Sequence, residues 1–260
     1  MLFFNGTQKR LIKELPLTGL KLSACVHITK KNRLLGGLTL VEIFIVLGII
    51  GVVAAITVPN LIQSYQKQAT VEGLKTVYNT LSVAIQQSII DNGPVSTWDM
   101  TGTTVADYGV FAETYILPYL SIAKRCQALT DECWAQKCLL LDNSVNSYFS
   151  AATNTRYSVI LTNGMVVGFW PRNTWAEIHV DINGKKGPNI MGKDQFDMTM
   201  YKTATPNRGL YFYQQNQQGL SRTDLMTTGY PCAKTGSLAG FYCGALIFLD
   251  GWQIADDYPW

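Results

Sequence analysis

Few residues in this sequence are of types that could do chemistry. Glu42 is the single charged residue in the apolar stretch from Leu38 to Ile62, and a carboxylate there is costly unless a partner neutralises it. His179 is the one histidine after residue 37, and a lone histidine inside a predicted strand is far more often structural than catalytic. No Gly-x-Ser-x-Gly, phosphate-binding glycine-rich loop or His-Glu-x-x-His pattern occurs. We therefore expect that the chain is not an enzyme.

A run rich in oxygen ligands lies between residues 181 and 197, and its candidate metal ligands are Asp181, Asn183, Asp194 and Asp197. Hard cations such as Ca²⁺ take about six to eight oxygen ligands, which Asp and Asn side chains separated by turns can supply. The run lacks the spacing and the closing Glu of an EF-hand, and three lysines lower its negative charge. The pattern favours an Asn-Gly turn followed by an Asx-capped loop. No cofactor is expected, and calcium on these four residues is the alternative.

The sequence holds six cysteines, of which Cys25 lies in the basic N-terminal segment. In an oxidising compartment we expect two disulfides among the other five, Cys126, Cys133, Cys138, Cys232 and Cys243. Cys232 with Cys243 would close a short glycine-containing loop and is the favoured pair. Cys126 is expected to pair with either Cys133 or Cys138. Zinc is disfavoured, because the first three cysteines include no Cys-x2-Cys pair and no histidine lies near them.

The N-terminal segment 1–37 is basic and the rest of the chain is not. It holds seven Lys and Arg residues against Glu14 alone, a net charge of +6, while the whole chain carries +3, so residues 38–260 carry −3. Nucleic acid is therefore not a predicted partner. The apolar stretch 38–62 is long enough to cross a bilayer, which takes about 20 residues. Its basic flank is expected on the cytoplasmic side. An ordinary signal peptide fits poorly, because no Ala-x-Ala cleavage site follows.

The junction between these segments carries a specific motif. Gly37-Leu38-Thr39-Leu40-Val41-Glu42 resembles the cleavage and methylation motif of type IV prepilins, in which Gly precedes the cut and Glu is the fifth mature residue. Leu38 would be the first mature residue, where the family usually has Phe. Pro59 falls where such proteins usually have a helix-weakening proline. The resemblance covers about residues 31–90, and the leader is longer than is common.

The resemblance implies how the chain is processed and assembled. Prepilin peptidase/methyltransferase would cut after Gly37 and methylate the amine of Leu38. The subunit would sit in the bacterial inner membrane by one span, with a periplasmic C-terminal domain. The inner-membrane assembly platform would then add it to other pilin or pseudopilin subunits. Glu42 would compensate the amine of a neighbour in the filament. The 181–197 run also resembles a loop of secretion-system pseudopilins whose major members bind calcium.

Several functions stay open at this point. The filament is either a type II secretion pseudopilus or a type IV pilus, with a competence system as a further option. The chain is either a major subunit or a minor one at the tip or in priming. From a different class, it is a membrane-anchored ligand- or glycan-binding domain, with Trp134, Trp170, Trp175 and Trp252 as candidate lining residues, although they are more often core residues.

The apolar stretch is expected to continue as an amphipathic helix over residues 60–93. Apolar residues keep i, i+3/i+4 spacing from Leu74 to Ile89, and Asp91-Asn92-Gly93-Pro94 ends the pattern. The sequence thus predicts one helix of about 50 residues, whose first half lies in the membrane and whose second half packs on a domain.

Residues 95–260 are enough for one compact domain, rich in residues that favour strands and turns. Asn163-Gly164 predicts a hairpin between strands 157–162 and 165–170. Further strands are predicted at 175–182 and 208–213, a helix at 107–124 with an interruption near Pro118, and either a helix or a strand at 245–254. The expected fold class is α+β and pilin-like, a long N-terminal helix packed on an antiparallel sheet.

Overall fold

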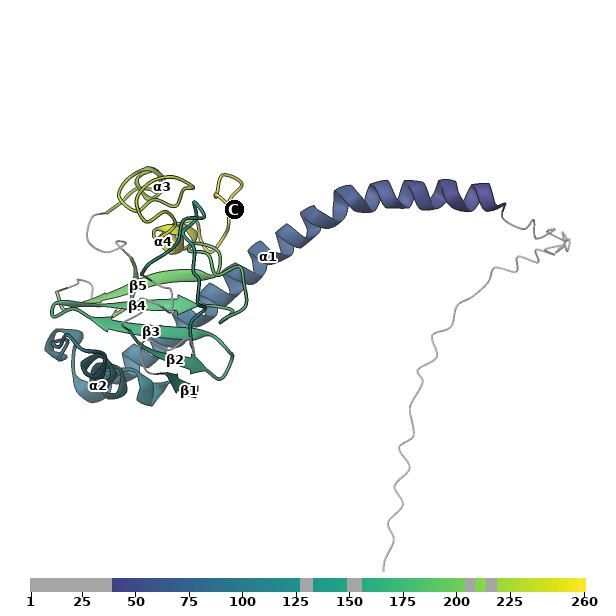
Figure 1. The fold of residues 1–260 in the computed structure, drawn as a ribbon. Coiled ribbons are helices and arrows are strands. Elements are labelled where there is room, and N and C mark those ends of the chain that lie inside the picture. The colour runs from purple at the N-terminus through teal and green to yellow at the C-terminus, as the bar shows by residue number, and fades with distance from the viewer. Residues whose placement is uncertain (1–38, 127–132, 149–155, 204–208, 214–218) are drawn as a thin grey trace, which may run out of the picture. The chain divides into compact units, whose positions relative to one another are not determined.

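The computed structural model describes residues 39–126, 133–148, 156–203, 209–213 and 219–260 (Figure 1). The chain divides into two compact units, Met1–Gly51 and Val52–Trp260. The predicted leader 1–37, with Cys25 and Gly37, and the predicted first mature residue Leu38 lie outside the described residues. The site of the expected cleavage therefore remains a prediction from the sequence.

Helix α1 runs from Leu40 to Asn92 as a single helix of 53 residues, as predicted. It is long and apolar enough to cross a membrane. It continues through Pro59, which lies inside it. It stops where the sequence placed its end, because Gly93 has a positive φ of 80°, a conformation that glycine adopts easily after a helix.

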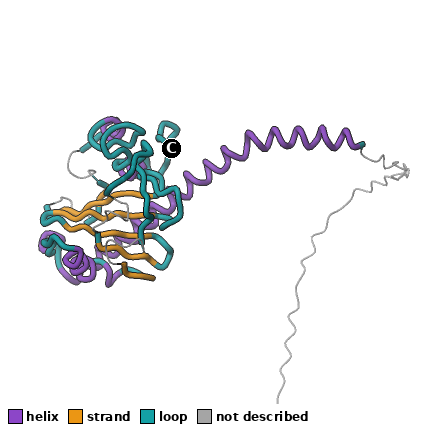
Figure 2. The backbone as a smooth tube through the Cα atoms, in the orientation of Figure 1, coloured by secondary structure: helices purple, strands orange, loops and turns teal. Residues whose placement is uncertain are grey.

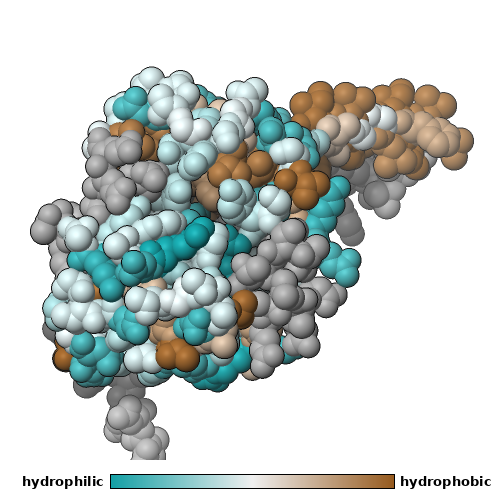
Figure 3. Space-filling view, turned by 60° about the vertical axis from the view of Figure 1, so that its left-hand side comes forward, coloured by the Kyte–Doolittle hydropathy of each residue, from teal (hydrophilic) through white to brown (hydrophobic). Residues whose placement is uncertain are grey.

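Burial changes abruptly along α1. Before Thr70 nearly every residue of the helix is exposed, including its large aliphatic side chains, and Figure 3 shows the projecting part of the helix as mostly brown. From Thr70 onward one stripe is buried, at Thr70, Val71, Leu74, Val77, Leu81, Ala84, Ile85 and Ser88. The spacing of this stripe is the i, i+3/i+4 spacing read from the sequence, so the amphipathic second half of the helix is confirmed.

The strands form one antiparallel sheet of six, in the order β1-β2-β3-β4-β5-β6 (Figures 1 and 2). Each strand pairs with the next along the chain, which makes the sheet a meander. Together with α1 the sheet gives the predicted α+β class. The bounds are β1 Ile122–Cys126, β2 Tyr157–Leu161, β3 Val166–Pro171, β4 Trp175–Asp181, β5 Gln195–Tyr201 and β6 Tyr211–Phe212.

The hairpin predicted around Asn163-Gly164 is confirmed as β2 and β3, and Gly164 has a φ of 86°. Strand β4 is also confirmed. The strand predicted at 208–213 is reduced to the two residues of β6, with residue 208 outside the described range. The segment that could have been helix or strand becomes helix α4, Cys243–Leu249.

Two predicted boundaries are wrong. The helix expected over 107–124 is α2, Val105–Tyr115, followed by a 3₁₀ turn at Leu117–Tyr119 that contains Pro118, and β1 then begins at Ile122. Proline lacks the N–H that a continuing helix needs, so the helix ends before Pro118 instead of continuing beyond it. The loop expected to run to Asp197 stops at Asp194, because β5 takes the following residues. Helix α3, Arg222–Thr227, was not predicted.

The two faces of the sheet differ in chemistry. One face is apolar and packs on the second half of α1, where Tyr78 stacks on Phe212 of β6 with ring centroids 5.2 Å apart. The other face carries a buried polar row on β4 and β5, namely Glu177, His179, Asp181, Gln195, Asp197 and Thr199. The segment 133–148 and the residue Arg156 cover this row, since Trp134 Nε1 donates to Ser158 Oγ on β2 and Gln195 Nε2 donates to Cys138 Sγ.

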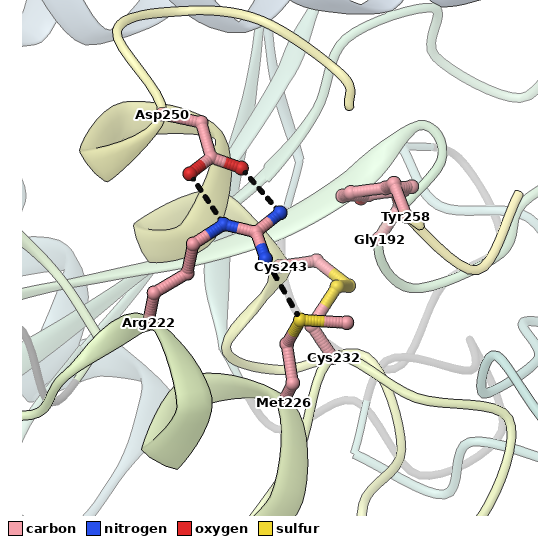
Figure 4. The surroundings of a disulfide bond; sticks show 7 residues. All are labelled: Gly192, Arg222, Met226, Cys232, Cys243, Asp250 and Tyr258. Carbon is pink, nitrogen blue, oxygen red and sulfur yellow. Dashed lines mark hydrogen bonds and ion pairs between the residues drawn. A yellow bond between two sulfur atoms is a disulfide. The ribbon is translucent and has the colours of Figure 1, made fainter. Parts of the chain in front are cut away.

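The C-terminal part is held by a disulfide and an ion pair, drawn in Figure 4. Cys232 is bonded to Cys243 at the start of α4. Arg222 of α3 donates from Nε and Nη2 to the Asp250 carboxylate at 2.8 and 3.0 Å, which ties α3 to the end of α4. The buried Tyr258 hydroxyl donates to the Gly192 carbonyl before β5.

Candidate functional site

The four candidate calcium ligands are divided between two places. Asp181, Asn183 and Asp194 meet where β4 leaves the sheet and the chain returns to β5. Asp197 lies instead within β5, directly opposite His179 of β4. Asp197 therefore lies apart from the other three candidate ligands, and calcium on this set remains a prediction from the sequence.

Asp194 closes the loop 182–194 by accepting hydrogen bonds. Its carboxylate receives the backbone N–H of Asn189 at 2.7 Å, the N–H of Ile190 at 2.6 Å and the Asn183 amide at 3.2 Å. Asp181 likewise accepts from the Asn183 N–H at 3.2 Å and from Gln195 at 3.0 Å. These contacts describe the Asx-capped loop that the sequence favoured. Among the described oxygens of this set, only Asn183 Oδ1 receives no hydrogen bond.

The second place is a triad of titratable side chains in the middle of the sheet. Glu177 and His179 lie on β4 and Asp197 on β5, with 7%, 0% and 0% of their surfaces exposed. His179 Nε2 lies 3.1 Å from Glu177 Oε2, and His179 Nδ1 lies 3.1 Å from Asp197 Oδ1. Because β4 and β5 are central strands of a paired sheet, the three side chains are fixed by the register His179–Asp197.

Asp197 stands out among the buried carboxylates by its lack of donors. Neither of its oxygens accepts a well-aligned hydrogen bond from any described residue. The Met198 N–H lies near enough to lower its pKa slightly, and the His179 ring contacts it without good alignment. Thr199 Oγ1, next along this face of β5, is buried near the Tyr201 hydroxyl and makes no well-aligned hydrogen bond within the described part. An ionised carboxylate in such surroundings is strongly disfavoured.

Arg156 brings one positive charge to the triad. Its Nη2 lies 3.7 Å from Glu177 Oε2, its guanidinium sits 4.4 Å from the centre of the Trp170 ring, and Nη1 donates to the Tyr148 carbonyl. Arg172 lies 3.5 Å from the same Trp170 ring centre. A buried Arg–carboxylate pair is expensive to break, because either partner alone would be an uncompensated buried charge.

Burial shifts the pKa of every member of the triad toward its neutral form. It raises the pKa of Glu177 to about 7, with the charges of Arg156 and Arg172 acting against the rise. Burial, and secondly the charge of Glu177, hold the pKa of Asp197 well above its usual value. Burial, and secondly the charge of Arg156, hold the pKa of His179 well below its usual value. A single buried cation, Arg156, therefore faces two carboxyl groups and a neutral ring, while the exposed Arg172 acts on Glu177 from the rim.

The triad has residue types that hold metals, and one ligand atom of each lies within 4.8 Å of the others. Its geometry fits hydrogen bonding better. The two carboxyl groups approach different ring nitrogens, whereas a histidine ligand offers a metal one nitrogen, to which both carboxylates would have to turn. Arg156 already supplies a cation beside Glu177. The arrangement describes a buried charge and proton network.

The remaining candidate residues are structural. Cys232–Cys243 is confirmed, and of the two options for Cys126 the structure shows Cys133. Cys138 keeps a buried thiol, and burial raises its pKa to about 11, so it is a poor nucleophile.

The four tryptophans named for a glycan site are not gathered at one place. Trp134 is buried and bonded to Ser158, and Trp252 packs between Tyr78, Phe212 and Phe248. Trp170 and Trp175 are half-buried beside Arg172. The contacts are those of core and rim packing.

Glu42 has a local partner that the sequence reasoning missed. Its carboxylate accepts from the Thr39 N–H at 2.8 Å and the Thr39 hydroxyl at 3.0 Å, and the Glu42 N–H donates to Thr39 Oγ1 at 3.3 Å. This is a capping box, and the Thr-x-x-Glu spacing before an apolar run was its signal. Glu42 thus caps the start of α1 within its own chain.

Comparison with known proteins gives one match. A family model described as a family of unknown function, DUF6613, matches residues 60–260. The chain belongs to the DUF6613 family. No curated protein and no solved structure matches the chain. The matched range includes the triad, the loop 182–194 and both disulfides, whereas Glu42 and Pro59 precede it.

Three members of the buried network in this DUF6613 chain were missed from sequence, namely Arg156, Glu177 and Thr199. The signal for two of them was the alternation of polar residues on adjacent strands, Glu177-x-His179-x-Asp181 and Gln195-x-Asp197-x-Thr199. Such alternation usually indicates a solvated face. Nothing in the sequence marked Arg156.

Proposed function

We propose that this protein is a pilin-like structural subunit of a bacterial filament, either a type II secretion pseudopilus or a type IV pilus. It is processed after Gly37 by prepilin peptidase, methylated at Leu38, anchored in the inner membrane by the first half of α1 and assembled with other pilin-type subunits. The domain after the anchor lies in the periplasm. The role is mechanical, with no catalysis and no cofactor.

The observation that carries this proposal is the placement of the motif at the start of an unbroken helix. Gly37-Leu38 comes directly before α1, whose exposed apolar residues extend for more than six turns before the first buried residue, Thr70. An exposed apolar surface of this size needs lipid or other subunits to cover it. The buried stripe that begins at Thr70 packs the second half of the same helix into the core of the domain.

The capping box sharpens the proposed role of Glu42. In the single chain its carboxylate is satisfied by Thr39. In a filament the methylated amine of a neighbouring Leu38 would approach a carboxylate that is already oriented by its own helix start. The side chain then acts twice, as an N-cap partner and as the counter-charge of the neighbour.

Processing is the first test. The full chain is expressed in a host with prepilin peptidase, and its intact mass is measured. The expected mass is that of residues 38–260 with one added methyl group, and substitution of Gly37 by a bulky residue such as Arg is expected to leave the precursor uncut. An uncut wild-type chain, or a cut at another position, would overturn the proposal.

Assembly is tested by two matched variants at the capping box. Glu42→Gln keeps an oxygen for the cap and removes the charge, so it is expected to insert and be processed but to be absent from sheared filaments. Thr39→Ala removes the cap partner and keeps the charge, so it is expected to enter filaments. Equal incorporation of both variants would show that the charge of Glu42 has no role in assembly.

A further inference from the structure

The buried triad raises a question of charge that is independent of filament formation. With Arg156 cationic and His179 neutral, ionising both Glu177 and Asp197 would leave one excess negative charge in a region without solvent. A buried charge of this kind is avoided by binding a proton or a cation. One proton is enough to bring the network to neutrality.

The position of that proton follows from the contacts. Glu177 has Arg156 beside it and lies 3.1 Å from His179 Nε2, so it is the carboxyl group that is best supported as an anion. Asp197 has no well-aligned donor among the described residues, and the Arg156 guanidinium lies against Glu177. We propose that Asp197 is held as the neutral acid, its hydroxyl directed toward His179 Nδ1, while the Nε2–H of the neutral ring donates to an ionised Glu177 paired with Arg156.

The pKa directions of Asp197 and His179 agree with this assignment, whereas burial also raises the pKa of Glu177 to about 7 against the charges of Arg156 and Arg172, so Glu177 adds a pH dependence of its own that wild type and a variant at Asp197 share. Burial holds the pKa of Asp197 well above and that of His179 well below their ordinary values. Other titratable groups also face the triad. The positive charges that act on the triad are Arg156, from the segment before β2, and Arg172, from the β3–β4 turn. Tyr201 of β5 also faces the triad, and its hydroxyl is influenced by the charges of Asp197, Glu177 and Tyr242. The arginines favour the anion at Glu177.

The arrangement works as a pH-sensitive latch on the cover of the sheet. Arg156 is bound at once to Glu177 and to the Tyr148 carbonyl, so it ties the covering segment to β4. If Asp197 lost its proton, a second anion would compete for the same guanidinium and strain the closed cover. The protein is thus expected to hold its cover closed while Asp197 keeps its proton, and to loosen it as the pH rises and that proton is lost.

The sign of the stability effect follows from linkage. A carboxyl group whose pKa is raised on folding retains a proton that the unfolded chain releases, so its stabilisation is complete below the unfolded pKa near 4 and is lost as the pH rises toward the folded pKa. Each unit of pH then changes the folding equilibrium by up to about tenfold for one retained proton. His179 contributes with the opposite sign below about pH 6.5, equally in wild type and in a variant at Asp197.

The decisive variant is Asp197→Asn, which imitates a neutral acid and cannot titrate. Unfolding of the full chain in a non-ionic detergent is followed between pH 5 and pH 7. We expect the folding equilibrium of wild type to fall with pH by up to about a hundredfold more than that of Asp197→Asn. Asp142→Asn, at an exposed Asx turn, is the matched control, and we expect its folding equilibrium to fall with pH as steeply as that of wild type.

The ring of His179 gives a second, direct readout. With ¹⁵N-labelled histidine the chain has two pairs of ring-nitrogen signals, one pair for each histidine, and His27→Gln identifies the pair of His27. The expected result at pH 7 is a neutral His179 ring protonated on Nε2. An imidazolium spectrum, or stability curves of wild type and Asp197→Asn that run parallel, would overturn the proposal. So would a stoichiometric metal found by elemental analysis of the purified wild-type protein.

Discussion

Asp194 and Asp197 lie three residues apart, both are buried, and their surroundings differ in nearly every respect. Asp194 receives two backbone N–H groups and one side-chain amide. Asp197 receives no well-aligned donor within the described residues and faces a histidine and a second acid. The difference teaches that burial alone does not decide what a carboxylate does. The number of N–H groups directed at it decides whether it can remain an anion.

Their consequences for the fold also differ. The anion at Asp194 organises a loop, because its oxygens replace the backbone partners that residues 189 and 190 lack. Asp197 accepts no well-aligned hydrogen bond from the described residues, so it does not hold a loop in place; its effect on stability comes from the proton that it retains. Burial raises the pKa of Asp194 as well, but there the N–H groups of Ile190 and Asn189 and the amide of Asn183 act against the rise. Asp194 therefore shapes the structure through the hydrogen bonds that it accepts, and Asp197 through the proton that it retains.

The largest expected effect comes from removing the anion on which the triad depends. Glu177→Gln leaves Arg156 buried without its counter-charge, and we expect a loss of about 3 kcal/mol in the free energy of unfolding at pH 8. Denaturant unfolding measures it. The double variant Glu177→Gln, Arg156→Gln is the control and is expected to lose less than the sum of the single variants. Strict additivity would mean that the two charges do not interact.

A somewhat smaller loss of stability is expected from variants of Asp194. Asp194→Ala leaves the N–H groups of Asn189 and Ile190 without an acceptor, and we expect a loss of about 2 kcal/mol that does not change between pH 6 and pH 8. Asp194→Asn retains one oxygen and is expected to lose about half as much. A pH-dependent loss in this range would place Asp194 with Asp197 and remove the distinction between them.

The surroundings of Asp194 could be predicted from the sequence, whereas those of Asp197 could not. The turn signals and the Asp/Asn loop were readable, because Asn-Gly turns and Asx caps are local, and the hairpin and the α1 boundaries followed from local patterns as well. Strand β5 was not predicted from the sequence, because its alternating Gln195, Asp197 and Thr199 have the pattern of a solvated face. Only the covering segment, which comes from far away in the sequence, makes that face interior.

The disulfides and the N-terminal motif show the same limit. Cys232 and Cys243 are close along the chain, so their pairing was predictable, whereas the choice between Cys133 and Cys138 for Cys126 depends on how the cover folds. Cys138 is directed to Gln195 on the polar face instead. The Thr39–Glu42 capping box is a local pattern, so its Thr-x-x-Glu spacing was enough to predict it.

The smallest expected effect tests whether the cover keeps the triad dry. Gly168 of β3 lies opposite His179, and a Cβ at this position would meet Trp134 Cζ2 at 3.0 Å and Ser158 Oγ at 3.2 Å. Gly168→Ala is expected to push the cover outward at a cost of about 1 kcal/mol. Gly51→Ala, in open space on α1, is the control and is expected to cost nothing. If water then reaches Asp197, its pKa falls and the difference in pH slope between wild type and Asp197→Asn shrinks in the Gly168→Ala background. A slope difference of unchanged size would mean that the neutral acid is held by its immediate neighbours and not by the exclusion of water.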